Sequence, residues 1–265
     1  MTIVSYIVNI SHAMKNEHTS RVSLQEMVKA GVHLGHHTSK WHPKMEQYLY
    51  GSKNNLHIIN LEVTQEKLDE AFEFINKTVA SGKDVLFVAT KKQVVPIVKQ
   101  TAEETEMPYA VKRWIGGTFT NFKNVSKRIK QLVQLEEKLA TGKLESYTKK
   151  ERKVFGDKVE KGNKLFQGLK NLKTLPGAVF VEDITRDHLA IKEAHDMGIP
   201  VIALADSNVN PEMVDYAIPA NDDAISSVGL IYAAVAEVIK EAKNSRKAPE
   251  APAKEEESKK EKATA

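Results

Sequence analysis

The sequence predicts an α/β fold in which helices cover both faces of a parallel β-sheet, with a pair of helices inserted into the sheet domain. Three observations support this prediction. Continuous apolar runs at 85–89, 178–181 and 201–205 are typical of strands that are buried on both faces. Amphipathic segments alternate with these runs, as they do in a doubly wound sheet. The segment 121–170 breaks the alternation, because its apolar residues have the spacing of two consecutive helices.

The N-terminal part is predicted to begin with a short helix. Ser23 and Glu26 have the spacing of a capping box, and Gly31 is a residue type that commonly ends a helix. The segment that follows is predicted to be rich in loops, with two short strands at 48–50 and 57–59.

The remainder of the sheet domain alternates between helices and strands. Helices are predicted at 64–80, 92–105, 186–197 and 221–242. Two further short strands are predicted at 109–111 and 216–218. Three acidic residues near strand ends or helix starts, Asp206, Asp222 and Asp223, are interpreted as caps, because acidic side chains suit the positive end of a helix dipole.

The inserted segment 121–170 is predicted to form an antiparallel helical hairpin, a coiled coil that projects from the sheet. Val125, Ile129 and Leu132 belong to a narrow apolar stripe along its first helix. Its second helix contains glycines, each of which weakens a helix by roughly 1 kcal/mol relative to alanine. We expect an apolar seam between the two helices and a basic outer surface.

Charge is concentrated in this inserted segment. It holds 14 lysine and arginine residues against 6 aspartate and glutamate residues, a net charge of +8, whereas the whole chain carries only +4. Such asymmetry favours a polyanionic partner that is reached through one part of the molecule. A solvated basic face that has no partner is the alternative interpretation.

Domain boundaries follow from these patterns. The parts are an N-terminal extension at 1–21, a sheet domain at 22–120 and 171–242, the basic hairpin at 121–170 and a disordered tail at 243–265. The tail has no large apolar side chain and cannot bury enough surface to fold alone. No apolar run approaches the roughly 18 residues of a membrane span, and neither a signal nor a transit peptide is predicted. The absence of cysteine suits a reducing compartment.

Motifs for nucleotide binding and catalysis are missing. After the first long apolar run the chain continues Thr90-Lys91-Lys92-Gln93, without the glycines that close a loop on phosphate. No GxGxxG follows a predicted strand, and no GxSxG nucleophile elbow is present. The sequence therefore predicts neither an enzyme nor a bound cofactor, and a nucleotide-dependent enzyme is a disfavoured alternative.

Histidines are dense in one segment, at His33, His36, His37, His42 and His57. Neutral imidazoles can bind zinc, but their spacing here is irregular and there is no cysteine to complete a site. A metal is therefore not predicted. A zinc-stabilised adaptor that contacts protein rather than RNA remains an alternative hypothesis.

An ordered set of short motifs identifies a likeness to a known family. The motifs are Ala30-Gly31-Val32-His33-Leu34-Gly35-His36, Trp41-His42-Pro43-Lys44-Met45, Arg113-Trp114-Ile115-Gly116-Gly117, Thr120-Asn121-Phe122, Gly198-Ile199-Pro200-Val201 and Asn221-Asp222-Asp223-Ala224-Ile225. In this order they resemble the bacterial-type small-subunit ribosomal protein S-two family, over roughly residues 22–242.

The resemblance implies a flavodoxin-like sheet with an inserted helical hairpin, in a non-catalytic structural protein of the cytoplasmic ribosome. It also implies binding to small-subunit ribosomal RNA between the head and the body of the subunit. Neighbouring ribosomal proteins are implied partners, including ribosomal protein number one, which the family helps to dock near the messenger exit. Neither a membrane nor a small-molecule substrate is expected.

Two groups of residues are predicted to contact RNA. On the hairpin, basic side chains would bind phosphate without reading sequence; they are Lys123, Lys127, Arg128, Lys130, Lys149, Lys150, Arg152 and Lys153. In the second group basic and aromatic residues interleave, as in surfaces that stack unpaired bases; these are Lys40, Trp41, His42, Lys44, Lys53 and Arg113. By contrast, Trp114 is expected to be a packing anchor, in a structural joint between the hairpin and the acidic sheet domain.

Overall fold

The structure is a computed structural model that describes residues 20–142, 144 and 147–247. Most of the predicted N-terminal extension and most of the predicted disordered tail lie outside the described residues. One boundary needs correction, because helix α8 (Ile225–Lys247) continues through residues 243–247, which were predicted to be disordered. The end of this helix is tied to the sheet domain by Lys243, whose Nζ donates to the carbonyl oxygen of Thr105 at 2.6 Å.

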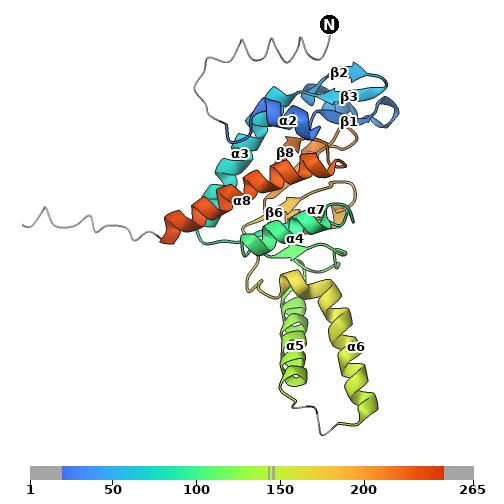
Figure 1. Ribbon diagram of the computed structural model, residues 1–265, viewed down its shortest axis with the longest axis vertical. Coiled ribbons are helices and arrows are strands. Elements are labelled where there is room, and N and C mark those ends of the chain that lie inside the picture. The colour runs from blue at the N-terminus through green and yellow to red at the C-terminus, as the bar shows by residue number, and fades with distance from the viewer. Residues whose placement is uncertain (1–19, 143, 145–146, 248–265) are drawn as a thin grey trace, which may run out of the picture.

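A five-stranded parallel sheet forms the centre of the molecule, which confirms the predicted α/β class (Figure 1). Its strands are β4 (Val85–Val88), β5 (Tyr109–Ala110), β6 (Ala178–Val181), β7 (Val201–Ala205) and β8 (Tyr216–Pro219). They lie in the order β5-β4-β6-β7-β8, which in chain order is 2-1-3-4-5, as in flavodoxin. All residues of β4, β6 and β7 are buried, because helices cover both faces.

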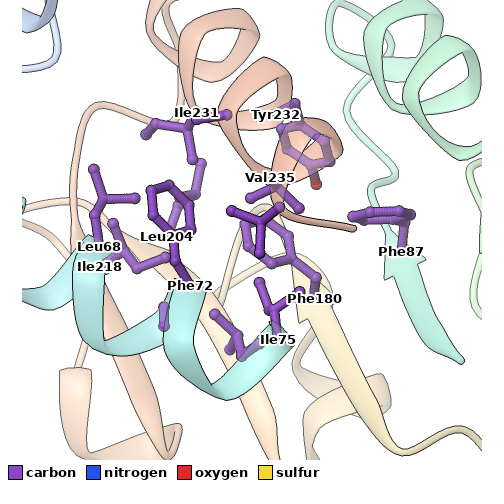
Figure 2. Close-up of a cluster of buried hydrophobic side chains, with 14 of the residues drawn as sticks. Leu68, Phe72, Ile75, Phe87, Phe180, Leu204, Ile218, Ile231, Tyr232 and Val235 are labelled. Carbon is purple, nitrogen blue, oxygen red and sulfur yellow. The ribbon is translucent and has the colours of Figure 1, made fainter. Parts of the chain in front are cut away.

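Two apolar clusters, one on each face of the sheet, form the core. The first contains Phe87, Phe180 and residues of helices that include α3 (Leu61–Ala80), α4 (Val95–Glu104) and α8. Figure 2 shows Tyr232 of α8 over these rings, and its ring centroid lies 5.1 Å from that of Phe180. The second cluster contains α7 (His188–Asp196) and residues at the base of the inserted helices. Alternate residues of each strand supply the two clusters, as the pleat requires.

A smaller antiparallel sheet packs beside the N-terminal helix α2 (Leu24–Ala30). The predicted capping box of α2 is confirmed, and its C-cap glycine has a φ of 77°. The strands are β1 (Leu34–His37), β2 (Leu49–Lys53) and β3 (Leu56–Ile59), in the order β1-β3-β2. Strand β1 was missed by the sequence analysis. Its Gly35 approaches another loop so closely that a Cβ atom would lie 2.8 Å from the hydroxyl oxygen of Ser207.

Short 3₁₀ helices complete the described elements. They are η1 (Thr38–Lys40), η2 (Pro43–Tyr48), η3 (Gln167–Leu169) and η4 (Pro211–Met213). No helix in the described ranges is both long enough and apolar enough to span a membrane.

The inserted segment contains helices α5 (Phe122–Ala140) and α6 (Lys149–Phe166), which lie side by side and extend away from the sheet (Figure 1). The predicted apolar stripe of α5 is buried at Val125, Ile129 and Leu132. Gly162 has a role that propensity alone does not reveal: a Cβ atom there would lie 2.5 Å from Cδ1 of Leu132. The glycine therefore lets α6 approach α5 closely.

Candidate functional site

The outer surface of the inserted helices is basic. All eight hairpin residues predicted to contact RNA are exposed. At 100° per residue, Lys123, Lys127 and Lys130 fall on the side of α5 that is opposite its buried stripe. Within the described part of the chain, none of the eight side chains forms an ion pair.

Acidic side chains on the same helices are engaged elsewhere. Glu136 of α5 accepts from Asn163 of α6 and from Lys170, whose Nζ lies 2.7 Å from Glu136 Oε2. The carboxylate of Glu151 accepts from the backbone N–H and the hydroxyl of Thr148, both at 2.9 Å, in a capping box at the start of α6. The Glu136 contacts join α5 to α6, the Glu151 contacts cap α6, and neither set neutralises the outer basic charges.

The second predicted group does not join the first. Its residues Lys40, Trp41, His42, Lys44 and Lys53 lie on or beside the small sheet, at the opposite end of the molecule from the tip of α5 and α6 (Figure 1).

Their contacts make this group less available to RNA than the hairpin. Lys44 pairs with Glu212, so its charge is balanced. His42 is half-buried, and its Nδ1 accepts from the backbone N–H of Lys44 at 3.3 Å. Trp41 is 38% exposed, with its ring centroid 5.7 Å from that of His57. Arg113, the remaining member, is exposed between β5 and α5.

Trp114 is a packing anchor, as predicted. It is only 6% exposed, and its ring meets that of Phe119 edge to face, with centroids 4.9 Å apart. Its indole N–H donates to Oε1 of Glu193, a residue of α7, at 3.2 Å. The stretch that leads into α5 is therefore fixed to the sheet domain.

Glu193 holds this joint together, and the sequence analysis did not identify it. Besides the indole, its carboxylate accepts from the backbone N–H groups of Gly117 at 2.7 Å, Phe119 at 3.0 Å and Thr120 at 3.4 Å. Burial alone raises the pKa of Glu193, but these donors outweigh burial and hold the pKa below its ordinary value. One ionised side chain thus accepts hydrogen bonds from the N–H groups of the turn that leads into α5.

A second polar cluster lies at the carboxyl ends of the parallel strands, the edge where open α/β sheets commonly bind ligands. Its centre is the ammonium group of Lys91, just beyond β4. Nζ of Lys91 lies 2.9 Å from Asp222, 3.0 Å from Asp223, 3.1 Å from Asp183 and 3.6 Å from Glu182. A lysine from the chain itself therefore occupies the middle of this edge.

The cluster holds more acidic groups than its cation can neutralise. Glu182 is fully buried, and neither of its oxygens accepts a hydrogen bond from the described residues. Burial raises the pKa of Glu182 to about 8 and that of Asp222 to about 7. Burial lowers the pKa of Lys91, but the carboxylates, Asp222 foremost, outweigh it and raise the pKa above its ordinary value. Glu182 therefore carries a proton at neutral pH.

Only one of the five clustered histidines joins this edge. Nδ1 of His36 lies 3.0 Å from Oδ2 of Asp206, and the hydrogen bond between them is the largest cause of the raised pKa of His36. Ligand atoms of His36, Asp206 and Asp222 lie within 4.8 Å of one another, so these three side chains could hold a metal ion. Lys91 would compete with such an ion for Asp222.

The predicted capping role was wrong for all three acidic residues, since Asp223 pairs with Lys91 and His36 instead of capping a helix. Asp206 binds His36, and Asp222 binds Lys91, because both follow strands whose ends meet at the same edge. The turn that leads into α8 is instead closed by Asn221, whose Oδ1 accepts from the backbone N–H groups of Asp223 and Ala224 at 2.9 and 3.0 Å.

Replacing Glu182 with glutamine should change how stability depends on pH. The folded chain keeps the Glu182 proton up to a pH of about 8, whereas the ordinary carboxyl pKa, which we assign to the unfolded chain, is 4.5. The free energy of unfolding of the wild type therefore falls as the pH rises through this window. Because the variant lacks this titration, it should gain about 2–4 kcal/mol relative to the wild type between pH 5 and pH 8.

Denaturant unfolding at both pH values measures this difference. Glu104→Gln is the matched control, since Glu104 is an exposed carboxylate paired with Lys240. A stability difference between Glu182→Gln and the wild type that is the same at both pH values would contradict the prediction.

Comparison with known proteins agrees with the resemblance in the sequence. A sequence model of the family described as Ribosomal protein S2 matches residues 27–242. The small ribosomal subunit protein uS2 of Roseiflexus castenholzii is 43% identical over 230 residues, which cover 87% of this chain and 88% of that protein. The uS2 protein of Thermus thermophilus is 43% identical over 222 residues, covering 84% of this chain and 87% of its own length. That of Salinibacter ruber is 41% identical over 227 residues, covering 86% of this chain and 71% of its own length. The chain therefore belongs to the ribosomal protein S2 family.

Proposed function

We propose that the chain binds small-subunit ribosomal RNA through the exposed basic side chains of α5 and α6. Membership of the S2 family gives the chain a structural role in the small ribosomal subunit and makes it a ribosomal structural protein rather than an enzyme. The single observation that carries the RNA proposal is that eight exposed basic side chains have no ion-pair partner among the described residues. Phosphate groups carry the opposite charge and are typical partners of such side chains.

The geometry of the helices supports contact at a distance from the sheet. A helix of 19 residues, such as α5, is about 28 Å long, so it can carry basic groups far into a neighbouring RNA. We infer that α5 and α6 act as an antiparallel coiled-coil hairpin, since Gly162 admits Leu132 and Lys170 pairs with Glu136. In this proposal the sheet domain serves as a rigid base.

The resemblance in the sequence extends the proposal. It suggests that the chain lies between the head and the body of the small subunit, in the cytoplasmic ribosome. It also suggests that the chain helps to dock ribosomal protein number one near the messenger exit. The exposed residues Lys40, Trp41 and Lys53 would form a second, weaker contact surface at the other end of the molecule.

Neutralising the outer face of α5 should weaken RNA binding and its dependence on salt. The variant replaces Lys123, Lys127 and Lys130 with glutamine. Each lost phosphate contact lowers the slope of log K against log salt concentration by roughly 0.7–0.9, so the slope should become shallower by about 2 to 3. Titration of small-subunit rRNA with the full chain at several salt concentrations measures this slope.

The matched control removes three lysines that are paired with acidic residues on the sheet domain. It replaces Lys77, Lys99 and Lys240, which lie on α3, α4 and α8, with glutamine. This variant should bind with nearly the slope of the wild type. An equal loss of slope in both variants, or no loss in the hairpin variant, would reject the proposed interface.

A further inference from the structure

We propose that Tyr147, at the tip of the hairpin, is a stacking platform for one unpaired base of the bound RNA. The inference rests on the proposed function and adds a second kind of contact to it. Tyr147 lies just before α6 and is 44% exposed, although a large aromatic side chain is ordinarily covered. An exposed aromatic ring amid basic residues is a typical surface for a base.

The position of Tyr147 is fixed before any ligand arrives. Its backbone N–H donates to the carbonyl oxygen of Leu144 at 3.1 Å, and Leu144 itself is buried. Its ring meets that of Phe155 edge to face, with centroids 5.3 Å apart and planes at 89°. The next residue, Thr148, forms the capping box of α6. A ring held by these contacts loses little freedom when it stacks on a base.

Of the two tip aromatics, Tyr147 has the open surface. Phe155 is half-buried, and the ammonium group of Lys158 lies 5.9 Å from its ring centroid. The hydroxyl of Tyr147 makes no hydrogen bond with the described part of the chain, so no polar contact there restrains the orientation of the ring. A base could therefore approach Tyr147 while Phe155 supports it from the protein side.

Charge around the tip would orient the nucleotide. Four basic residues in the first turns of α6, Lys149, Lys150, Arg152 and Lys153, are all exposed. Phosphates on either side of a stacked base would lie within reach of such side chains, as in other proteins that bind unpaired nucleotides. The tip thus combines a ring for the base with cations for the backbone.

A purely structural role for Tyr147 makes a different prediction. If the ring served only to cover Phe155, another apolar side chain of similar size would replace it. Leucine keeps this cover but has no aromatic face. Phenylalanine keeps both the cover and the face. The pair Tyr147→Leu and Tyr147→Phe therefore separates packing from stacking.

The experiment measures binding of the full chain to small-subunit rRNA, at several salt concentrations, with chemical probing of each base. Tyr147→Phe should bind like the wild type. Tyr147→Leu should bind roughly 5- to 100-fold more weakly with an unchanged salt slope, because stacking releases no counterions. One base that the wild type protects should become reactive. Val154→Ala is the matched control, since Val154 is an apolar residue of α6 that is also 44% exposed.

Three results would overturn the inference. They are wild-type affinity in Tyr147→Leu, an equal loss in Val154→Ala, and a loss accompanied by a lowered melting temperature of the free protein. If Tyr147→Leu binds normally while the lysine variants of α5 change the salt slope, stacking fails and the proposed function stands. If even the wild type does not bind this RNA, the proposed function itself fails.

Discussion

Replacing Lys91 with methionine should lower the free energy of unfolding by about 3–5 kcal/mol at pH 7, because removing one partner of a buried ion pair leaves uncompensated charge. The Lys91 side chain is only 14% exposed, and four carboxylates lie within 3.6 Å of its Nζ. Methionine retains the apolar stem and removes the ammonium. The ionised members of this acidic cluster would then repel one another, without a cation between them, at the ends of the central strands.

The same variant should recover part of its stability in acid. At pH 5 Glu182 and Asp222 hold their protons in the wild type, and without Lys91 their pKa values rise further, so they hold them in the variant as well. The loss measured by denaturant unfolding should therefore be smaller at pH 5 than at pH 9, where the wild type has both groups ionised beside Lys91. Lys99→Met is the matched control, since Lys99 is a partly exposed lysine whose Nζ lies 3.6 Å from Glu103 one helical turn away. A loss as small as that of the control would show that the carboxylates do not depend on Lys91.

Replacing Glu193 with glutamine should cost about 2–4 kcal/mol of the free energy of unfolding. The carboxylate accepts from four N–H groups and from the hydroxyl of Thr120, with both Thr120 contacts at 3.4 Å. Glutamine offers one acceptor oxygen and turns two donors toward a site that is already lined with donors. Each buried N–H group left without a partner costs about 1–3 kcal/mol.

Two measurements test the role of Glu193. Denaturant unfolding gives the stability loss, with Glu104→Gln as the control for an exposed carboxylate. Hydrogen exchange at the backbone N–H groups of Gly117 and Phe119 reports on the joint itself. Faster exchange there, with unchanged exchange in β6 and β7, is the expected pattern. Uniform acceleration across the sheet would mean that Glu193 supports the whole fold rather than this joint.

Much of the fold could be predicted because its signals are local. Strands such as 178–181 and 201–205 are continuous apolar runs, and the stripe of Val125, Ile129 and Leu132 has helical spacing, so pattern and structure agree. Strand β1 was not predicted, because it contains Gly35, a residue type that disfavours strands. The glycine is needed there because a Cβ atom would clash with Ser207, which lies far away in the sequence. Local propensity contains no information about such a neighbour.

The polar sites were less predictable, for a related reason. Lys91, Glu182 and Asp222 each follow a different strand, and only the order of strands in the sheet brings them together. Glu193 has backbone N–H groups as partners, and these have no signature in side-chain sequence. One signal was available: several acidic residues follow predicted parallel strands, whose carboxyl ends meet at one edge.

The position of α5 and α6 in the chain affects how far the basic surface can extend from the sheet. They lie between β5 and β6, in a connection that the chain must close before β6 can pair with β4. Loop-closure entropy grows slowly, by about 0.6 kcal/mol for each doubling of loop length. Adding or removing one turn from each helix would move the tip by about 5.4 Å and barely alter that entropy. The distance to which this protein extends its basic surface can therefore vary almost independently of the stability of its sheet.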